Sequence, residues 1–296
     1  LVLTAVWQKW RFSAPQTHLW LIKVWFSAST FVLKITTFAN PETIKGNLKM
    51  TRKAIIIGSP GSKNSTTYLK GVEVDLHHFA SFLKSSLGGS WENHEITELF
   101  NCPSQNLMES FQNTNTDFLL VYFSGHGQQN LKETIIAIND NESISISQLI
   151  SIIQTPKALI IIDTCRHLKD NEHSSFSGPE YLSFNSLFDQ TNTRDKYLQI
   201  ISECAPGIAI AYSCSVGEMS SETELGGDYT YSLLKSSLEW YDNPANEGVL
   251  FIDSANDLAH QHLKSKSNFD QHPQIKTTNG PAENLNFPFA IISNSR

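Results

Sequence analysis

The sequence is poor in charge, in cysteine and in long apolar runs. Charged residues make up 17% of its 296 positions, basic residues are outnumbered 22 to 29, and there are 4 cysteines. The resulting net charge of −7 argues against a general nucleic-acid binder, which usually carries a basic stripe. Neither metal-ligand spacing nor a disulfide framework is present, which favours a reducing, cytoplasmic compartment. The cysteines are Cys102, Cys165, Cys204 and Cys214.

No apolar run reaches the ~18 residues that a membrane-spanning helix requires. The hydrophobic content of 40% excludes a disordered chain, and the length allows a full core. By length alone the chain fits two average domains or one large α/β domain.

Residues 1–49 differ in composition from the rest. They carry a formal charge of +5, which leaves −12 for residues 50–296, and they hold four of the six tryptophans. They show no sustained periodicity, whereas Met50 precedes a clean apolar run, Ala54–Gly58. We interpret residues 1–49 as a non-native or disordered extension, translated from upstream sequence, with the natural start at Met50. A membrane or targeting segment is the rival interpretation.

The remainder alternates between strand and helix patterns. Apolar strands separated by helices predict a mainly parallel sheet covered on both faces, with the carboxyl ends of its strands at one edge. The segment 166–205 is polar and irregular, and we expect a functional loop or a processed linker there. The predicted strands are 53–58, 94–100, 117–123, 134–138 (a short edge strand or hairpin), 157–163, 207–212 and 286–292, and the predicted helices are 72–87, 105–112, 147–154, 228–240 and 254–264.

Two short motifs end the most apolar strands. Ser124-Gly125-His126-Gly127 follows one of them, and Asp163-Thr164-Cys165 follows another. A thiol is nucleophilic as a thiolate, and an imidazole within reach can act as its base and later protonate the leaving amine. The backbone N–H groups of Gly127 and Cys165 are natural oxyanion donors. Either residue alone is better explained as a buried thiol or a solvated loop histidine, but the pair predicts a Cys165/His126 dyad.

With these motifs the chain resembles the caspase-like cysteine peptidases, which include caspases, metacaspases, paracaspases and many bacterial relatives. The resemblance covers residues 52–292 and includes Gly226-Gly227-Asp228-Tyr229-Thr230 before a helix and Gln271-His272-Pro273-Gln274 before the last strand. It implies a single caspase-like domain over residues 50–296, with the long polar linker within it. The fold implied is a three-layer α/β/α sandwich around a mainly parallel six-stranded sheet.

The resemblance also implies a substrate preference. Caspases have Gln two residues before the nucleophile and cleave after Asp, whereas this chain has Asp163 there. Asp75, Ser124 and Asp163 resemble the acidic pocket of metacaspases and paracaspases, which accepts Arg or Lys at P1. The alternatives are a cap or loop hydrogen bond at the strand end for Asp163 and a helix-surface or structural role for Asp75. The residues after the nucleophile, Arg166-His167-Leu168, depart from the His-Ser-Gly that is usual in metacaspases.

No cofactor is expected. Some metacaspases use calcium, but solvated loops carry acids as often as calcium sites do, so calcium is kept as an alternative. One cysteine with two loop histidines lacks the fourth ligand of a zinc site. The acids in roughly suitable regions are Asp140, Glu142, Asp170 and Glu172.

The function expected from the resemblance is a cysteine endopeptidase of the metacaspase or peptidase C14 kind, acting on protein or peptide substrates with a basic P1 residue. Linker cleavage matures many relatives, so autocleavage at Arg194 or Lys196 is a hypothesis. Compact bacterial relatives resemble effectors of stress or antiphage cell death, some acting on gasdermin-like proteins, which implies an activating partner protein. The alternatives are a catalytically silent scaffold that binds partners and an unrelated α/β domain with a fortuitous dyad.

Overall fold

The computed structural model describes residues 50–112, 114–167, 182–184, 187, 192–266, 271–278 and 285–292. The predicted extension, residues 1–49, lies outside these ranges, as does much of the expected linker between residues 168 and 191. Within the described ranges, no helix is both long and apolar enough to cross a bilayer.

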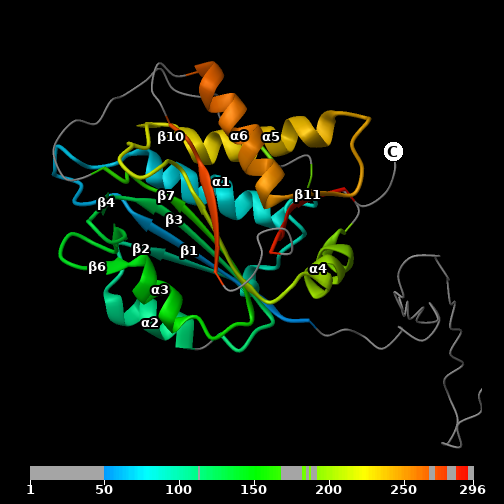
Figure 1. Cartoon of the computed structure of the whole chain (residues 1–296), viewed down its shortest axis with the longest axis horizontal. Coiled ribbons are helices and arrows are strands. Elements are labelled where there is room, and N and C mark those ends of the chain that lie inside the picture. Colours follow the sequence, from blue (N-terminus) through cyan, green and yellow to red (C-terminus); the bar gives the residue numbers. More distant parts are fainter. Residues whose placement is uncertain are drawn as a thin grey trace, which may run out of the picture. The chain divides into compact units, whose positions relative to one another are not determined.

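A six-stranded sheet, with the strand order β12-β8-β7-β3-β1-β2, organises the described part of the chain (Figure 1). Five strands are parallel, and the edge strand β12 runs antiparallel to β8. Every residue of β3 is buried, which is why it reads as an unbroken apolar run. The bounds are Arg52–Ser59 (β1), Ile96–Phe100 (β2), Phe118–Gly125 (β3), Lys157–Asp163 (β7), Gly207–Tyr212 (β8) and Gln274–Thr278 (β12).

Helices cover both faces of this sheet (Figure 1). Because side chains alternate along a strand, β3 supplies two separate cores: Tyr122 joins the side chains of α1, α4, α5 and α6, and Val121 joins those of α2 and α3. The α/β/α sandwich is therefore confirmed. The helices are Gly71–Lys84 (α1), Ser104–Gln112 (α2), Ile146–Ile152 (α3), Arg194–Glu203 (α4), Asp228–Asp242 (α5) and Ile252–Lys266 (α6).

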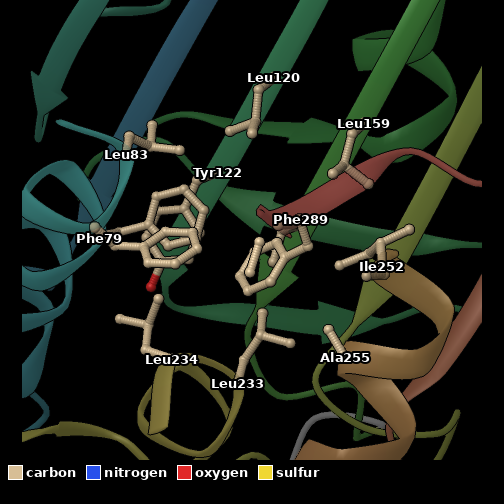
Figure 2. Close-up of a cluster of buried hydrophobic side chains, with 14 of the residues drawn as sticks. Phe79, Leu83, Leu120, Tyr122, Leu159, Leu233, Leu234, Ile252, Ala255 and Phe289 are labelled. Atoms are coloured by element: carbon tan, nitrogen blue, oxygen red, sulfur yellow. The ribbon is translucent and has the colours of Figure 1, made fainter. Parts of the chain in front are cut away.

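Aromatic stacking fixes α1 on the first of these cores. The ring of Phe79 lies flat on that of Tyr122, with 4.0 Å between centroids (Figure 2). Phe82 stacks on Phe289 of β13 (Pro288–Ile291) at 4.9 Å. Burial of such rings contributes several kcal/mol in large, well-packed cores, so α1 and the acidic residue it carries at position 75 are held firmly over the sheet.

Three small sheets complete the topology. A three-stranded sheet follows β3, and a two-stranded hairpin precedes α5. A third small sheet pairs β11 with β13. Their remaining bounds are Gly127–Gln129 (β4), Thr134–Ala137 (β5), Ser143–Ser145 (β6), Glu222–Thr223 (β9), Gly226–Gly227 (β10) and Val249–Phe251 (β11).

Two predictions are wrong in detail. The segment 166–205 is not irregular throughout, because α4 occupies its end. Tyr197 and Ile201, one turn apart, are the buried residues of α4. Leu198 and Ile200 are apolar but only half-buried, so the apolar positions of α4 do not form one clear stripe. The last strand, β13, does not enter the main sheet. The sixth strand of that sheet is β12, whose residues are half-buried or exposed and give no strand signal.

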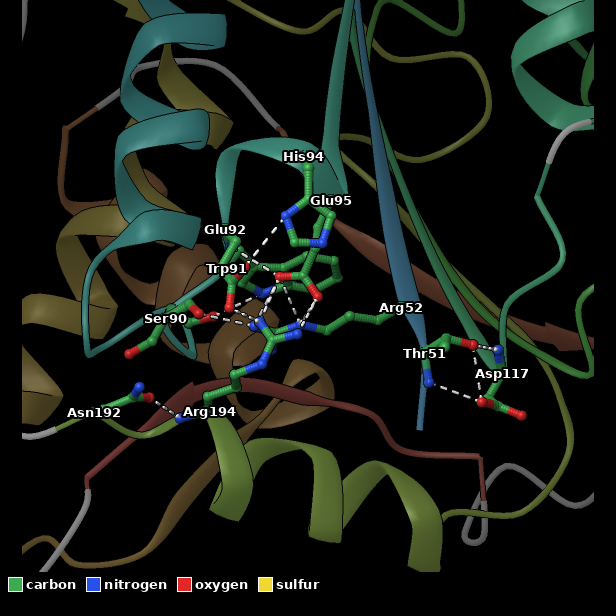
Figure 3. Close-up of polar contacts among 11 residues, drawn as sticks. Thr51, Arg52, Ser90, Trp91, Glu92, His94, Glu95, Asp117, Asn192 and Arg194 are labelled. Atoms are coloured by element: carbon green, nitrogen blue, oxygen red, sulfur yellow. Dashed lines mark hydrogen bonds and ion pairs between the residues drawn. The ribbon is translucent and has the colours of Figure 1, made fainter. Parts of the chain in front are cut away.

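The amino end of the sheet is held by a buried ionic cluster (Figure 3). Glu95 accepts hydrogen bonds from Arg52 Nε at 3.2 Å and from Arg194 Nη1 and Nη2 at 2.7 and 2.6 Å. The Arg52 guanidinium lies 4.2 Å from the Trp91 ring centroid. Burial alone would raise the pKa of Glu95, but the two guanidinium groups hold it below its ordinary value. The cluster therefore ties α4 to β1 and to the segment that precedes β2.

We predict that Glu95→Gln lowers the free energy of unfolding by about 3 kcal/mol, because it leaves the buried Arg52 guanidinium without its counter-ion. Denaturant unfolding at pH 7 measures this, with Glu98→Gln on the exposed side of β2 as the control, for which a change below about 0.5 kcal/mol is expected. The Glu95→Gln difference should shrink as the pH falls from about 4.5 through the lowered pKa of Glu95. Equal stability of the two variants at pH 7 contradicts the prediction.

Candidate active site

His126 leaves the sheet directly after β3. Its N–H donates to the Ser59 carbonyl at 3.1 Å, and its ring Nε2 lies 2.8 Å from the Thr67 carbonyl oxygen. A carbonyl can only accept, so Nε2 carries the proton and Nδ1 is the proton acceptor of the neutral ring. Gly61 packs against this ring: a Cβ there would lie 3.2 Å from Nε2, and its φ of +85° favours glycine. The loop after β1 thus sets both the orientation and the tautomer of His126.

Cys165 follows β7 at the position that corresponds to His126 after β3, because β3 and β7 are parallel neighbours. Ser124 pairs with Asp163 in their register, so each residue lies two positions beyond this pair, and neighbouring strands are about 4.8 Å apart. Thr164 Oγ1 donates to the Gly125 carbonyl at 2.7 Å. Thr164 also packs so closely on Gly127 that a Cβ at that position would collide with its hydroxyl. These contacts, which were not predicted from the sequence, hold together the two segments that carry the predicted dyad residues.

The Cys165 thiol is half-buried. Sγ donates to the Ser220 carbonyl at 3.5 Å. Burial raises the pKa of Cys165, and the negative charges of Asp163 and Glu222 raise it further. A base is therefore needed to generate the thiolate.

Hydrogen bonds of the neighbouring residues indicate the directions of the two predicted oxyanion donors. The Thr164 N–H donates to Ser213 Oγ and the Arg166 N–H to the Glu218 carbonyl, both on the β8 side. Since successive N–H groups of an extended chain alternate, we expect the Cys165 N–H to point to the opposite side. The Ala137 N–H donates to the His126 carbonyl, so the Gly127 N–H, which belongs to the same trans peptide, points away from β5. Both N–H groups therefore remain candidates for the oxyanion donors.

Asp75 and Ser124 meet beneath this edge. Ser124 Oγ donates to Asp75 Oδ2 at 2.7 Å, and the Gly227 N–H donates to Asp75 Oδ1 at 2.9 Å. Burial first, and then the charge of Asp163, raise the pKa of Asp75 well above its ordinary range. Asp75 is 2% exposed, so a helix-surface role does not fit, whereas a structural role is compatible with these hydrogen bonds.

Asp163 is buried beside it. Its Oδ1 accepts from Ser220 Oγ at 2.7 Å, and its Oδ2 accepts from Thr230 Oγ1 at 2.6 Å and from the Thr230 N–H at 3.1 Å. Burial raises the pKa of Asp163, although these hydrogen bonds oppose the shift. Asp163 also caps the first turn of α5, so the capping alternative and the pocket role are not exclusive.

The Gly226-Gly227 pair lets the two carboxyl groups approach each other. A Cβ on Gly227 would lie 2.5 Å from Asp163 Oδ2 and 3.2 Å from Asp75 Oδ2. Gly226 has a φ of +120°, and its Cβ would lie 2.5 Å from Asp75 Oδ1. Side chains are therefore excluded from β10 at this point, where the resemblance had identified only a helix start.

Glu222 is a third carboxyl group that the sequence prediction missed. It lies in β9, opposite Gly227 of β10. Burial and the charge of Asp163 raise the pKa of Glu222 to about 8. Nothing marks this glutamate in the sequence, because its position depends on the hairpin that folds back over the end of β7.

The two autocleavage candidates lie elsewhere. Arg194 and Lys196 are in α4, where Arg194 binds Glu95 and Lys196 Nζ donates to the Ile292 carbonyl at 2.6 Å. Glu95 precedes β2, so Arg194 is at the amino edge of the sheet, whereas Cys165 is at the carboxyl edge. An extended strand of the eight residues in β1 spans roughly 26 Å. Cleavage at either residue within one molecule would require α4 to detach.

The described residues contain no group of three or more His, Cys, Asp or Glu side chains arranged to hold a metal ion. Glu142 accepts hydrogen bonds from the Ser104 N–H at 3.0 Å and from Asn139 Nδ2 at 2.7 Å. Asp140 is exposed in the same turn, and Asp170 and Glu172 lie outside the described residues. All four cysteines are free thiols.

Comparison with known proteins identifies the fold. The family model for the caspase domain matches residues 51–282. Caspase-1 from Spodoptera frugiperda is 16% identical with a TM-score of 0.49, over 78% of this chain and 89% of that chain. Protein GSU0716 from Geobacter sulfurreducens is 14% identical with a TM-score of 0.50, over 81% and 99% of the two chains. No curated protein matches significantly.

We predict that Cys165 reacts slowly with iodoacetamide at pH 7 and that its rate rises with pH to a midpoint above 9.0, because burial raises its pKa. Mass spectrometry of the peptide that carries Cys165 measures the rate, and Cys165→Ser supplies the background. A rate that is already maximal at pH 7 would show instead that the resting thiol is ionised beside His126.

Proposed function

Since the chain belongs to the caspase-domain family of cysteine peptidases, we propose that it is a cysteine endopeptidase that uses Cys165 and His126. The observation that carries this proposal is the placement of both residues at adjacent strand ends, with the tautomer of His126 set by the Thr67 carbonyl.

The proposed reaction begins with proton transfer from Cys165 to Nδ1 of His126. The thiolate attacks the scissile carbonyl, and the N–H groups of Gly127 and Cys165 stabilise the developing oxyanion. The Thr67 carbonyl accepts a hydrogen bond from Nε2 throughout, which favours the imidazolium. That imidazolium then protonates the leaving amine, and water, activated by neutral His126, hydrolyses the thioester.

We propose that the P1 residue is Arg or Lys. Asp75, Asp163 and Glu222 gather on one side of Cys165, and their mutual repulsion is part of why their pKa values are raised. A guanidinium or ammonium group there would form charge-assisted hydrogen bonds and stabilise the ionised carboxylates. A P1 aspartate would add a further carboxylate to this cluster and lose affinity.

The wider role rests on resemblance alone. We place the enzyme in the cytoplasm, where its four thiols stay reduced, and propose a stress or antiphage cell-death effector with a gasdermin-like protein as a candidate substrate. The covered thiol of Cys165 suits an enzyme that waits for an activating partner. No cofactor is included in the proposal.

We expect the full-length protein to cleave fluorogenic peptides with P1 Arg or Lys, to leave P1 Asp and Leu peptides uncut, and to lose activity by at least about 10³-fold in Cys165→Ala. Assays with calcium and with a chelator should agree. Cleavage after Asp would overturn the acidic pocket, whereas failure of wild type to cleave any peptide, and to be labelled by an Arg-based covalent probe, would favour the scaffold.

At a pH above 8, where Glu222 is ionised, we expect Glu222→Gln to lower kcat/KM for the P1 Arg peptide about 10-fold, the value of one charge-assisted hydrogen bond. Glu222 is neutral below its pKa of about 8 and ionised above it, so KM of wild type for this peptide should fall as the pH rises through 8. The Gln variant should lack this change. Glu224→Gln, at the exposed tip of the same hairpin, is the control, and equal pH profiles for wild type and Glu222→Gln would remove Glu222 from the pocket.

A further inference from the structure

The peptide that follows the nucleophile is held on both sides. The Arg166 N–H donates to the Glu218 carbonyl and the Gly217 N–H donates to the Arg166 carbonyl, both at 2.9 Å. On the other side, the Gln129 N–H donates to the His167 carbonyl at 3.1 Å. Residues 165–167 are thus paired like a short strand between β4 and the turn after β8.

The carboxylate of Glu218 makes three contacts that hold this turn in place. Oε2 of Glu218 accepts from the Ser215 N–H at 2.9 Å and from the His272 N–H at 2.8 Å, and Oε1 lies 2.8 Å from His272 Nδ1. Burial alone would raise the pKa of Glu218, but these three contacts hold it below its ordinary value. The His272 ring is itself positioned by an edge-on contact with His260, at 5.2 Å between centroids.

The last residue of the turn, Glu218, and Ser220, two residues beyond it, supply carbonyl groups that contact two thiols. The Glu218 carbonyl accepts from Cys214 Sγ at 3.5 Å, and the Ser220 carbonyl accepts from Cys165 Sγ at the same distance. A displacement of the turn would therefore change both the backbone direction at Arg166 and the cover over the nucleophile. The pairing of Arg166 with Glu218 and Gly217 also sets the direction of the neighbouring Cys165 N–H. The alignment of this proposed oxyanion donor therefore depends on the same contacts.

We propose that Glu218 is a positioning residue for Cys165, acting through the turn Ser215–Glu218 rather than through contact with substrate. This inference rests on the proposed peptidase function, but its structural part concerns the thiol alone. The carboxylate anchors the turn to the segment before β12, and the turn aligns the thiol and N–H of Cys165. Without the carboxylate, the Ser215 and His272 N–H groups lose their acceptor, and the nucleophile becomes more accessible and less well aligned.

The variant Glu218→Ala tests this by two readouts that should move in opposite directions. We expect kcat for the P1 Arg peptide to fall at least about 30-fold while KM changes less than about 3-fold, because the P1 carboxyls are untouched. The rate of Cys165 alkylation by iodoacetamide at pH 8 should rise at least about 5-fold, since the cover over Sγ is loosened. Glu218→Gln retains one oxygen acceptor and should recover most of kcat.

Glu239→Ala is the matched control, because Glu239 also pairs with a histidine, His262, at 3.3 Å, but on the exposed side of α5 and α6. It should change neither readout. Alkylation of Cys102 and Cys204 in the same samples reports general unfolding: if their rates rise with that of Cys165, Glu218 is merely structural and the inference is overturned.

The positioning role of Glu218 and the proposed peptidase function can be contradicted separately. Unchanged Cys165 alkylation in Glu218→Ala overturns the inference, whether or not the protein cleaves peptides. An active wild type whose kcat is unchanged by Glu218→Ala overturns it as well and leaves the proposed function standing. A wild type that cleaves nothing, with Cys165 alkylation still faster in Glu218→Ala, overturns the proposed function and supports the positioning of the thiol.

Discussion

The parallel register of β3 with β7 is the constraint on which the site depends. Strands in a parallel sheet present their carboxyl ends at one edge, and this register pairs Ser124 with Asp163. That single alignment pairs a serine with an aspartate and sets His126 and Cys165 at corresponding positions after two neighbouring strands. The hydrogen bond from Thr164 Oγ1 to the Gly125 carbonyl joins the ends of these strands. A slip of one residue would exchange the faces of every side chain involved, so the buried cores on both sides of β3 also secure the site.

Buried ionisable groups are the second feature of the molecule. They have different partners at the amino edge and at the carboxyl edge of the sheet. At the amino edge, Glu95 is ionised between two guanidinium groups, and the cluster is complete within the chain. At the carboxyl edge, three carboxyl groups are close together with hydrogen-bond donors but without a paired cation among the contacts described for them. Their pKa values are raised, and this is the feature on which the proposal of a basic P1 residue rests. Burial likewise raises the pKa of the Cys165 thiol, whose Sγ donates to the Ser220 carbonyl.

The positions of the central strands and of most helices along the chain could be predicted, because each element is long and its apolar pattern is strong. β1, β3 and β7 are nearly continuous apolar runs, and α1 shows a regular buried face. Prediction failed where few residues carry the signal. α4 is held by Tyr197 and Ile201 within a polar segment, and β12 is a short, half-exposed edge strand whose place depends on its partner β8. Hairpins of two residues per strand, such as β9–β10, have no pattern to detect.

By itself the sequence determined the α/β class and pointed to the residues at strand ends, His126 and Cys165, because a strand and the residue after it are local features. The pocket residues Asp75, Ser124 and Asp163 came from resemblance, and the structure places Asp75 and Ser124 within hydrogen-bond distance. Only the tertiary structure decided that Thr67 orients the imidazole and that Glu222 joins the carboxyl cluster. The same holds for the link from Glu218 to the nucleophile's peptide. These contacts join loops that are far apart in the chain through backbone carbonyls and single side chains, and such contacts leave no periodicity or motif in a sequence.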